Sequence, residues 1–292
     1  MQIYNLGKCL YVLCDQGAIG EKDMVKLYDL SQPLNQETPF WPLYPPFEVK
    51  FIKRKPEHGV NAQYIMSSNH IGTHLDAPLH FVTNGKTIDQ IPLEWLYGPG
   101  IIVDVSEVGD LGIYTSELVE KNAKAAGGVK DGDILVLYTG WSKYAWYQKP
   151  KPEGTADEER YIHMHPGPVR EFCDWLLKKK IHIWGLDAVS TDHPMNLPIG
   201  RFLPRVHEKV RAAAAKKFGE ENLDKIFPPE DYQLTHNVLF PRDCIHMENL
   251  GGQIEEVLGG KKAVRTTIGC FPWLFKGGEA AFARVVAFDF SK

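Results

Sequence analysis

Residues 69–81 read NHIGTHLDAPLHF and carry three of the chain's eleven histidines and one aspartate. At the two-residue period of a strand, His70, His74, Asp76 and His80 share one face, and mainly apolar residues take the other. A helix would also align the first two histidines, but the glycine and threonine between them weaken a helix, and the later proline would interrupt it. The pattern therefore predicts an extended segment that becomes irregular near its proline and presents a row of polar side chains.

These residue types suit a metal ion. Neutral imidazoles and a carboxylate are the ligands that zinc, manganese and iron take in proteins. The two oxygens of Asp76 allow it to bridge two ions, which an imidazole nitrogen cannot do. A lone histidine is more often an ordinary buried side chain, but four ligand-type residues in phase favour a divalent metal site.

The composition excludes several classes of protein. With 292 residues, 43% of them hydrophobic and 24% charged, the chain is long and apolar enough to form a buried core that needs no disulfide bonds to stabilise it. The net charge of -4 and the lack of a basic stripe argue against a nucleic-acid partner, and no apolar run approaches the ~20 residues of a membrane span. Five cysteines without a CxxC pair, and the absence of a signal peptide, predict reduced thiols and a cytoplasmic location.

The chain divides into an N-terminal extension, residues 1–25, and one domain, residues 26–292. Within that domain, residues 33–47 hold five prolines and four aromatic residues. Such a stretch cannot pair as a central strand. Rigid aromatic side chains bind flat molecules at low entropic cost, so we expect Phe40 and Trp41 to line a substrate pocket, with simple packing as the alternative.

Short apolar runs outnumber helical patterns in the rest of the chain. The runs predict strands at 47–53, 100–105, 132–141, 181–187 and 283–288, and helices at 91–96, 116–126, 168–180 and 206–218. Thr115 is a candidate cap for the second of these helices. This combination predicts one α/β domain with a mixed, curved sheet flanked by helices.

The pattern HxGTHxDxPxH at 70–80 resembles the signature of the metal-dependent cyclase family, which includes kynurenine formamidases and isatin hydrolases. TPFWP at 38–42, GDILVLYTGW at 132–141 and GLDAVSTD at 185–192 are similar to further elements of that family. The resemblance covers about residues 27–290, with insertions at 141–165 and 195–230. It implies a swivelling β/β/α fold and a homodimer or homotetramer.

The resemblance also implies a set of metal ligands. His236 and Glu248, twelve residues apart, resemble a second ligand pair. His70, His74 and Asp76 would then hold one ion, and Asp76, His236 and Glu248 another. The cofactor would be Mn²⁺ or Zn²⁺, as one or two ions.

Four further roles concern Glu248 and residues outside the ligand sets. His80 is the candidate proton shuttle, because an imidazole both takes and gives a proton near pH 7. Glu248 could instead act as a base if only one ion binds. His246, two residues before it, is a candidate substrate contact, and Asp187 or Asp192 could orient a ligand histidine.

The chemistry that follows is hydrolysis of a small molecule by metal-activated water. Cyclic amides, lactones and cyclic 1,3-diketones, which would open to carboxylates, and aryl formamides are all candidate substrates. The sequence contains no GxSxG elbow of a serine hydrolase. One alternative is a non-haem Fe(II) oxygenase using His74, Asp76 and His236, which leaves other ligand-type residues without a role. A second alternative is a metal-dependent binding protein without catalysis.

Overall fold

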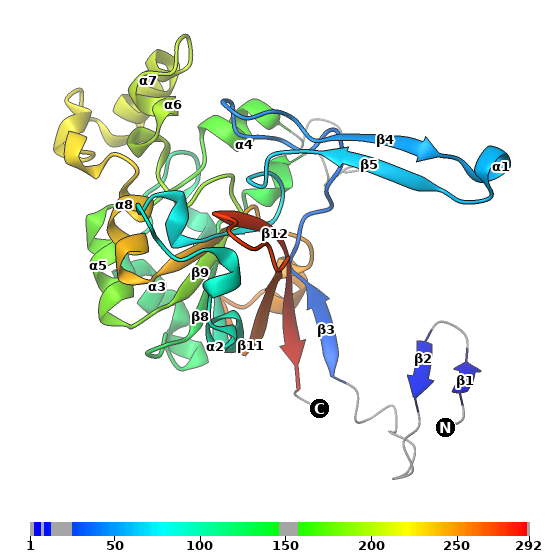
Figure 1. Cartoon of the computed structure of the whole chain (residues 1–292). Coiled ribbons are helices and arrows are strands. Elements are labelled where there is room, and N and C mark those ends of the chain that lie inside the picture. Colours follow the sequence, from blue (N-terminus) through cyan, green and yellow to red (C-terminus); the bar gives the residue numbers. More distant parts are fainter. Residues whose placement is uncertain (1–2, 7–8, 13–24, 146–156, 291–292) are drawn as a thin grey trace.

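The computed structural model describes residues 3–6, 9–12, 25–145 and 157–290 (Figure 1). In the predicted extension, β1 (Ile3–Leu6) and β2 (Cys9–Val12) form an antiparallel pair. The extension's boundary at residue 25 stays a prediction. Part of the predicted insertion at 141–165 lies outside the described residues.

The body is built on a sheet that closes on itself. Among the described residues, eight strands run in the order β11-β7-β8-β9-β10-β6-β12-β3, and a further pairing between β11 and β12 closes seven of them, all except β3, into a barrel. Their bounds are β3 (Lys26–Asp29), β6 (His74–Asp76), β7 (Tyr97–Asp104), β8 (Ile134–Tyr138), β9 (Ile183–Leu186), β10 (Ile245–Glu248), β11 (Ala263–Pro272) and β12 (Ala280–Asp289). The strands β7, β8, β9 and β10 are parallel neighbours, and the remaining pairs are antiparallel. The predicted mixed, curved sheet is thus confirmed, and β3 extends it beyond the barrel by pairing with β12.

The two faces of the barrel strands meet different surroundings. One face of all seven barrel strands contributes to a single buried cluster, including Leu75, Ile102, Val136, Ile183, Met247, Ile268 and Val285. Because side chains alternate along a strand, their neighbours point outward. On β7, β8 and β9 those neighbours pack under helices in a second cluster that contains Trp184 and Leu186.

Helices lie around the barrel and beside it (Figure 1). They are α2 (Leu93–Leu96), α3 (Ser116–Ala123), α4 (Glu158–His163), α5 (Arg170–Lys178), α6 (Pro198–Arg201), α7 (His207–Phe218), α8 (Leu234–Leu239) and α9 (Ile254–Leu258). Thr115 caps α3, as predicted, by accepting a hydrogen bond from the backbone of Leu118. The amphipathic pattern of α5 buries Phe172 and Leu176 against the sheet. None of the helices described is long and apolar enough to cross a lipid bilayer.

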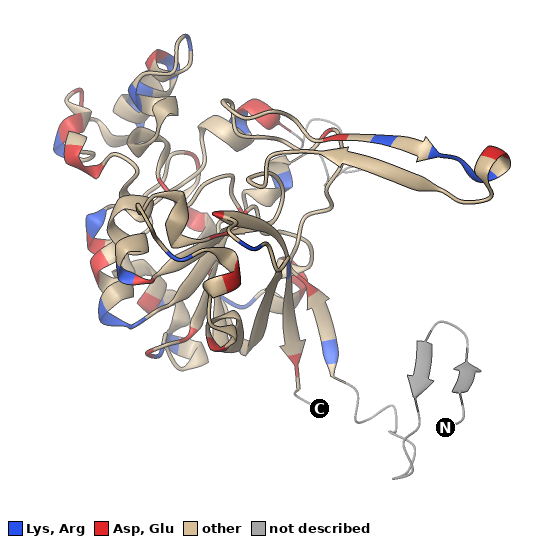
Figure 2. Cartoon of the chain, viewed as in Figure 1, with Lys and Arg blue, Asp and Glu red and all other residues tan. Residues whose placement is uncertain are grey.

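One hairpin projects from this body. It consists of β4 (Glu48–Lys53), the short α1 (Lys55–His58) and β5 (Ala62–Met66), and it extends sideways from the barrel (Figure 1). Elsewhere acidic and basic residues are interspersed over the body (Figure 2).

Candidate metal centre

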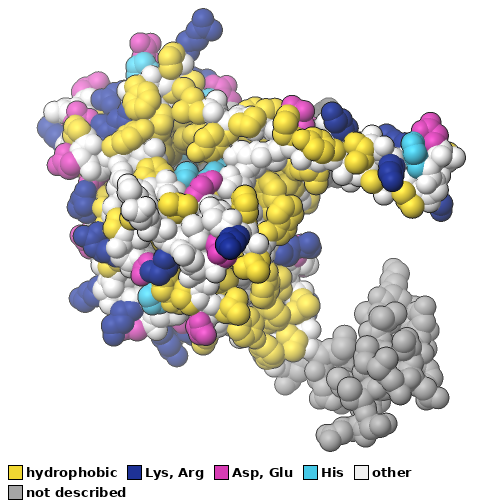
Figure 3. Space-filling view, in the orientation of Figure 1, with side chains coloured by type: hydrophobic (Ala, Val, Ile, Leu, Met, Phe, Trp, Pro, Cys, Tyr) yellow, Lys and Arg dark blue, Asp and Glu magenta, His cyan; other side chains and the backbone are white. Residues whose placement is uncertain are grey.

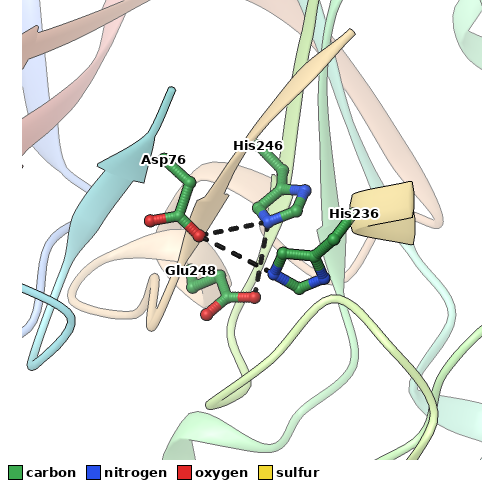
Figure 4. Close-up of side chains that lie close together, drawn as sticks. All are labelled: Asp76, His236, His246 and Glu248. Carbon is green, nitrogen blue, oxygen red and sulfur yellow. Dashed lines mark ion pairs between the residues drawn. The ribbon is translucent and has the colours of Figure 1, made fainter. Parts of the chain in front are cut away.

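Asp76 is the centre of a cluster of imidazoles. Its side chain is 1% exposed, and its two oxygens face different histidines. Oδ1 lies 3.1 Å from His70 Nδ1 and 3.3 Å from His74 Nε2. Oδ2 lies 3.3 Å from His246 Nε2 and 3.9 Å from His236 Nε2 (Figure 4). One carboxylate thus links two groups of nitrogen ligands.

Sheet pairing brings these segments together. The strands β6 and β10 are antiparallel neighbours, with Glu248 opposite His74. The two-residue period therefore places His74 and Asp76 on the same face as His246 and Glu248. The Glu248 carboxylate lies 3.6 Å from both His74 Nε2 and His246 Nε2.

The predicted extended segment is shorter in the structure than in the sequence pattern. Strand β6 covers only three residues, because Gly72 takes a φ of +62° just before it and a 3₁₀ turn (Pro78–His80) follows it. His70 therefore precedes the strand and His80 lies in the turn. Both rings still reach the cluster, with centroids 4.2 Å apart.

Hydrogen bonds orient two of the histidines. His74 Nδ1 donates to the carbonyl of Gly72 at 2.8 Å, which directs Nε2 toward Asp76. His236, on α8, contacts Asp192 through Nδ1 at 2.7 Å, so its Nε2 also faces the cluster. Such a carboxylate behind a histidine commonly fixes the tautomer of a metal ligand. The other aspartate considered, Asp187, instead accepts bonds from the Thr139–Ser142 turn.

Glu279 is a site residue that the sequence pattern did not reveal. Its Oε2 lies 2.6 Å from His70 Nε2 and 2.9 Å from His80 Nδ1, and Asn69 donates to its Oε1 at 2.7 Å. Glu279 precedes β12, whose first residue pairs with Asp76. Nothing in the local sequence marks an acidic residue about two hundred positions away as a partner of the HxGTH segment.

The charges in the cluster are strongly coupled. Burial lowers the pKa of His70, but Asp76 and Glu279 outweigh it and raise that pKa to about 10. Burial likewise opposes the charged form of Glu279, yet the bonds from His70 and His80 hold its pKa well below the usual range. The pKa of His246, in contrast, is lowered, chiefly by burial. The site therefore places negative charge where a cation can be held.

The unpaired atoms of the site fit a divalent cation. Within the described part of the chain, both Asp76 oxygens and His74 Nε2 are buried without a hydrogen-bond partner. Orphaned buried acceptors of this kind are costly unless an ion or water satisfies them. Among the described residues, three sets of ligand atoms lie within reach of one ion each, and two of them share Asp76. These two are Asp76, His236, His246 and Glu248, and His70, His74 and Asp76; the third is His70, His80 and Glu279. Nitrogen and carboxylate oxygen are the donors that zinc and manganese accept.

A cavity of about 300 Å³ opens onto this cluster. Its aromatic walls are Trp41, Tyr44 and Phe81, and its polar lining includes His80, His236 and Glu248. Two expected substrate contacts differ from this arrangement. Phe40 does not line the cavity, since its backbone forms a β-bridge with Ile71. His246 is fully buried among the ligand-type residues and does not line the cavity, because it lies beside Asp76 on the outer face of the barrel.

Comparison with known proteins agrees with these features. Residues 28–193 match the profile of a family described as putative cyclases. The chain belongs to the cyclase family. It is 31% identical over 165 residues to the kynurenine formamidase of Bacillus cytotoxicus, covering 56% of this chain and 69% of that protein. It is 30% identical over 208 residues to the kynurenine formamidase of Geobacillus thermodenitrificans, covering 71% and 87%. These relatives confirm the prediction of a hydrolase of this family.

Solved structures show the same fold. Isatin hydrolase A from Ralstonia solanacearum matches with a TM-score of 0.65 at 19% identity, covering 91% of this chain and 92% of that one. Isatin hydrolase A from Labrenzia aggregata, bound to benzyl benzoate, matches with a TM-score of 0.67 at 20% identity, covering 91% and 94%. The cyclase-like fold implied by the sequence resemblance is therefore confirmed.

Proposed function

We propose that this protein hydrolyses a small carbonyl compound with the help of one or two divalent ions, Mn²⁺ or Zn²⁺, held around Asp76. The observation that carries the proposal is the position of Asp76, a buried carboxylate with two unpaired oxygens between two sets of ligands. When bound, such an ion lowers the pKa of water to about 7 and polarises a carbonyl.

The side chains around Asp76 would hold the ions in two ligand sets. His70, His74 and Asp76 form one ligand set. His236 and Glu248 join Asp76 in the other, and His246 completes it in place of its expected role as a substrate contact. Two divalent ions would bring four positive charges, and the Glu248 carboxylate beside Asp76 would reduce the excess of positive charge. With a single ion, Glu248 would act as a base.

His80 is the proposed proton shuttle. It lines the cavity, and its Nδ1 is bound to Glu279, which leaves Nε2 for proton transfer with the substrate. It would take a proton from the attacking water and give one to the leaving nitrogen or oxygen, or to the leaving carbon of a 1,3-diketone. Glu279 contacts both this shuttle and the ligand His70, so it holds the two imidazoles in a fixed relation.

The aromatic walls favour a flat substrate. Trp41, Tyr44 and Phe81 offer aromatic rings to a planar group, and Asp76 and His80 line the same cavity. Cyclic amides, lactones, cyclic 1,3-diketones and aryl formamides all satisfy this geometry. The names of the relatives favour an aryl formamide or a cyclic amide such as isatin as the first compounds to test.

A substrate panel with controlled metal content tests the proposal. Protein treated with EDTA is reloaded with Mn²⁺ or Zn²⁺ under anaerobic conditions and offered one compound from each of the four classes. We expect metal-restored hydrolysis of at least one amide-type compound. If the metal-bound protein hydrolyses no compound of the panel, the alternative of a metal-dependent binding protein without catalysis is supported. Turnover that requires oxygen and ferrous iron would establish the oxygenase alternative.

Location and assembly belong to the same proposal. A cytoplasmic location is supported by Cys173, Cys244 and Cys270, which are buried free thiols. We also propose a homo-oligomer, as the resemblance to the family implies.

A further inference from the structure

Gln233 lines the cavity at the metal centre and lies on the segment that leads into α8. His236, a proposed metal ligand, follows three residues later and lines the same cavity. The Gln233 side chain does not cap α8, and it forms no hydrogen bond with any residue that the structure describes. A side-chain amide has one acceptor oxygen and an NH₂ group that donates. Gln233 therefore offers unused hydrogen-bonding groups to a molecule in the cavity.

The backbone of Gln233 has an unusual conformation. Its φ of +52° and ψ of +49° lie in the left-handed region, which residues other than glycine seldom adopt. Two hydrogen bonds hold it there: its N–H donates to the carbonyl of Asn196 at 2.7 Å, and its carbonyl accepts from the N–H of Asn237 at 2.9 Å. Glycine would adopt this conformation without strain. Strained residues of this kind cluster at functional sites, which points to a use for the glutamine side chain.

The other polar groups of the cavity lining are engaged or belong to aromatic rings. The Ser190 hydroxyl donates to Glu248 at 3.2 Å. The histidines and carboxylates of the lining are the proposed ligands and proton shuttle. The indole N–H of Trp41 and the hydroxyl of Tyr44 belong to the rings that would contact the flat part of a substrate. Within the described lining, the Gln233 amide is thus the polar group left for a second group of that substrate.

The charges around the cavity disfavour a charged substrate. The described residues that line it include no lysine or arginine. Figure 3 shows histidine and acidic atoms side by side on the body, bordered by hydrophobic and uncharged atoms. With its histidines neutral as ligands or shuttle, the site would be positive only at the ions, where the carbonyl to be hydrolysed must lie. A charged group elsewhere on the substrate would be buried without an ion-pair partner, which is costly.

We propose that the site takes an uncharged, flat carbonyl compound and that Gln233 binds a second, neutral polar group of this compound. The inference rests on the hydrolytic function proposed above and narrows its substrates. Cyclic amides, lactones and simple aryl formamides fit this description. An aryl formamide that carries ammonium and carboxylate groups does not. Gln233 acts in recognition of the substrate and not in the chemical step.

Binding of three acetophenones to the metal-loaded full chain tests the proposal. An aryl methyl ketone has a carbonyl like that of a substrate but cannot be hydrolysed. The para substituents are methylsulfonyl, sulfonate and isopropyl, which are similar in shape but are neutral and polar, charged, and apolar, respectively. Isothermal titration calorimetry gives each dissociation constant. We expect the wild type to bind the methylsulfonyl compound ~5-fold or more tighter than either of the others, as one additional hydrogen bond provides.

Two substitutions at Gln233 separate recognition from a structural effect. Gln233→Leu removes the amide at similar size, so it should weaken binding of the methylsulfonyl compound ~5-fold or more and leave the isopropyl compound unchanged. Gln233→Lys supplies a cation and should bind the sulfonate ~10-fold tighter than the wild type does, a gain that misfolding cannot produce. The matched control is Gln63→Leu, which makes the same change at an exposed position of β5 and should keep the wild-type values.

Several results would overturn the proposal. They are equal binding of the sulfonate and methylsulfonyl compounds by the wild type, equal weakening of all three compounds in Gln233→Leu, and binding of none of them. Loss of the methylsulfonyl preference in Tyr44→Phe but not in Gln233→Leu would also overturn it. These outcomes do not depend on turnover. A protein with the expected preferences that hydrolyses nothing would retain the binding role of Gln233 and refute the proposed hydrolysis, whereas hydrolysis without these preferences would do the reverse.

Discussion

Two buried histidines away from the metal centre should make the fold sensitive to acid. His165 is fully buried, and its Nδ1 lies 3.1 Å from the carbonyl oxygen of Pro166. His193 is also fully buried and stacks on Phe227, with ring centroids 4.3 Å apart. Burial lowers the pKa of His165 to about 3 and that of His193 to about 4.

The direction of the effect follows from proton binding. In the unfolded chain each imidazole has a pKa near ~6.5, so at pH 5 it binds a proton that the folded state excludes. The stability that these neutral imidazoles contribute is present above about pH 6.5 and is lost as the pH falls toward their folded pKa values. Between pH 7 and pH 5 the free energy of unfolding should fall by about 2 kcal/mol for each histidine.

Urea unfolding with EDTA, at one protein concentration, measures this loss. The His165→Gln variant removes one titrating group, so its loss between pH 7 and pH 5 should be smaller than the wild-type loss by about 2 kcal/mol. Contributions from the metal-centre histidines cancel in this comparison. The matched control is His182→Gln, which removes an exposed side chain and should keep the wild-type loss. A difference below about 0.5 kcal/mol between His165→Gln and wild type would refute the reasoning.

Four further predictions concern the metal centre. His74→Ala should lose metal by elemental analysis, and full occupancy with normal affinity would contradict its assignment as a ligand. His80→Ala should keep its metal and lose ~10²–10⁴-fold in kcat; a metal-free variant would make His80 a ligand. Glu248→Gln should lower the metal content from two ions to one if Glu248 is a ligand, or abolish activity at an unchanged single ion if it is a base. Glu279→Gln should retain metal but lose activity, with partial rescue in Glu279→Asp, because the shuttle needs its anchor; equal activity of all three proteins would remove Glu279 from the site.

Part of the site could be predicted from sequence because its determinants are local. The spacing of His70, His74 and Asp76 predicts that their side chains lie on the same side of the chain. They do so although the strand covers only three residues and the chain is irregular at both of its ends. The residue types alone identify candidate metal ligands, since imidazoles and carboxylates bind divalent ions in proteins. The strands and helices of the body could be predicted for the same reason. Hydrophobic periodicity and capping residues such as Thr115 are signals that extend over only a few positions of the sequence.

Tertiary structure decided which distant residues complete the centre. Closure of the barrel pairs β12 with β6 and so carries Glu279 to His70 and His80. Pairing of β10 with β6 sets His246 beside Asp76, whereas two-residue spacing from Glu248 showed only that both share a face. The hairpin of β4 and β5 is a similar case: alternation predicted a strand at 47–53 but not that the hairpin would project from the barrel. Strand order and closure arise from packing between segments far apart in the chain, and a local pattern carries no information about which partner each strand will meet.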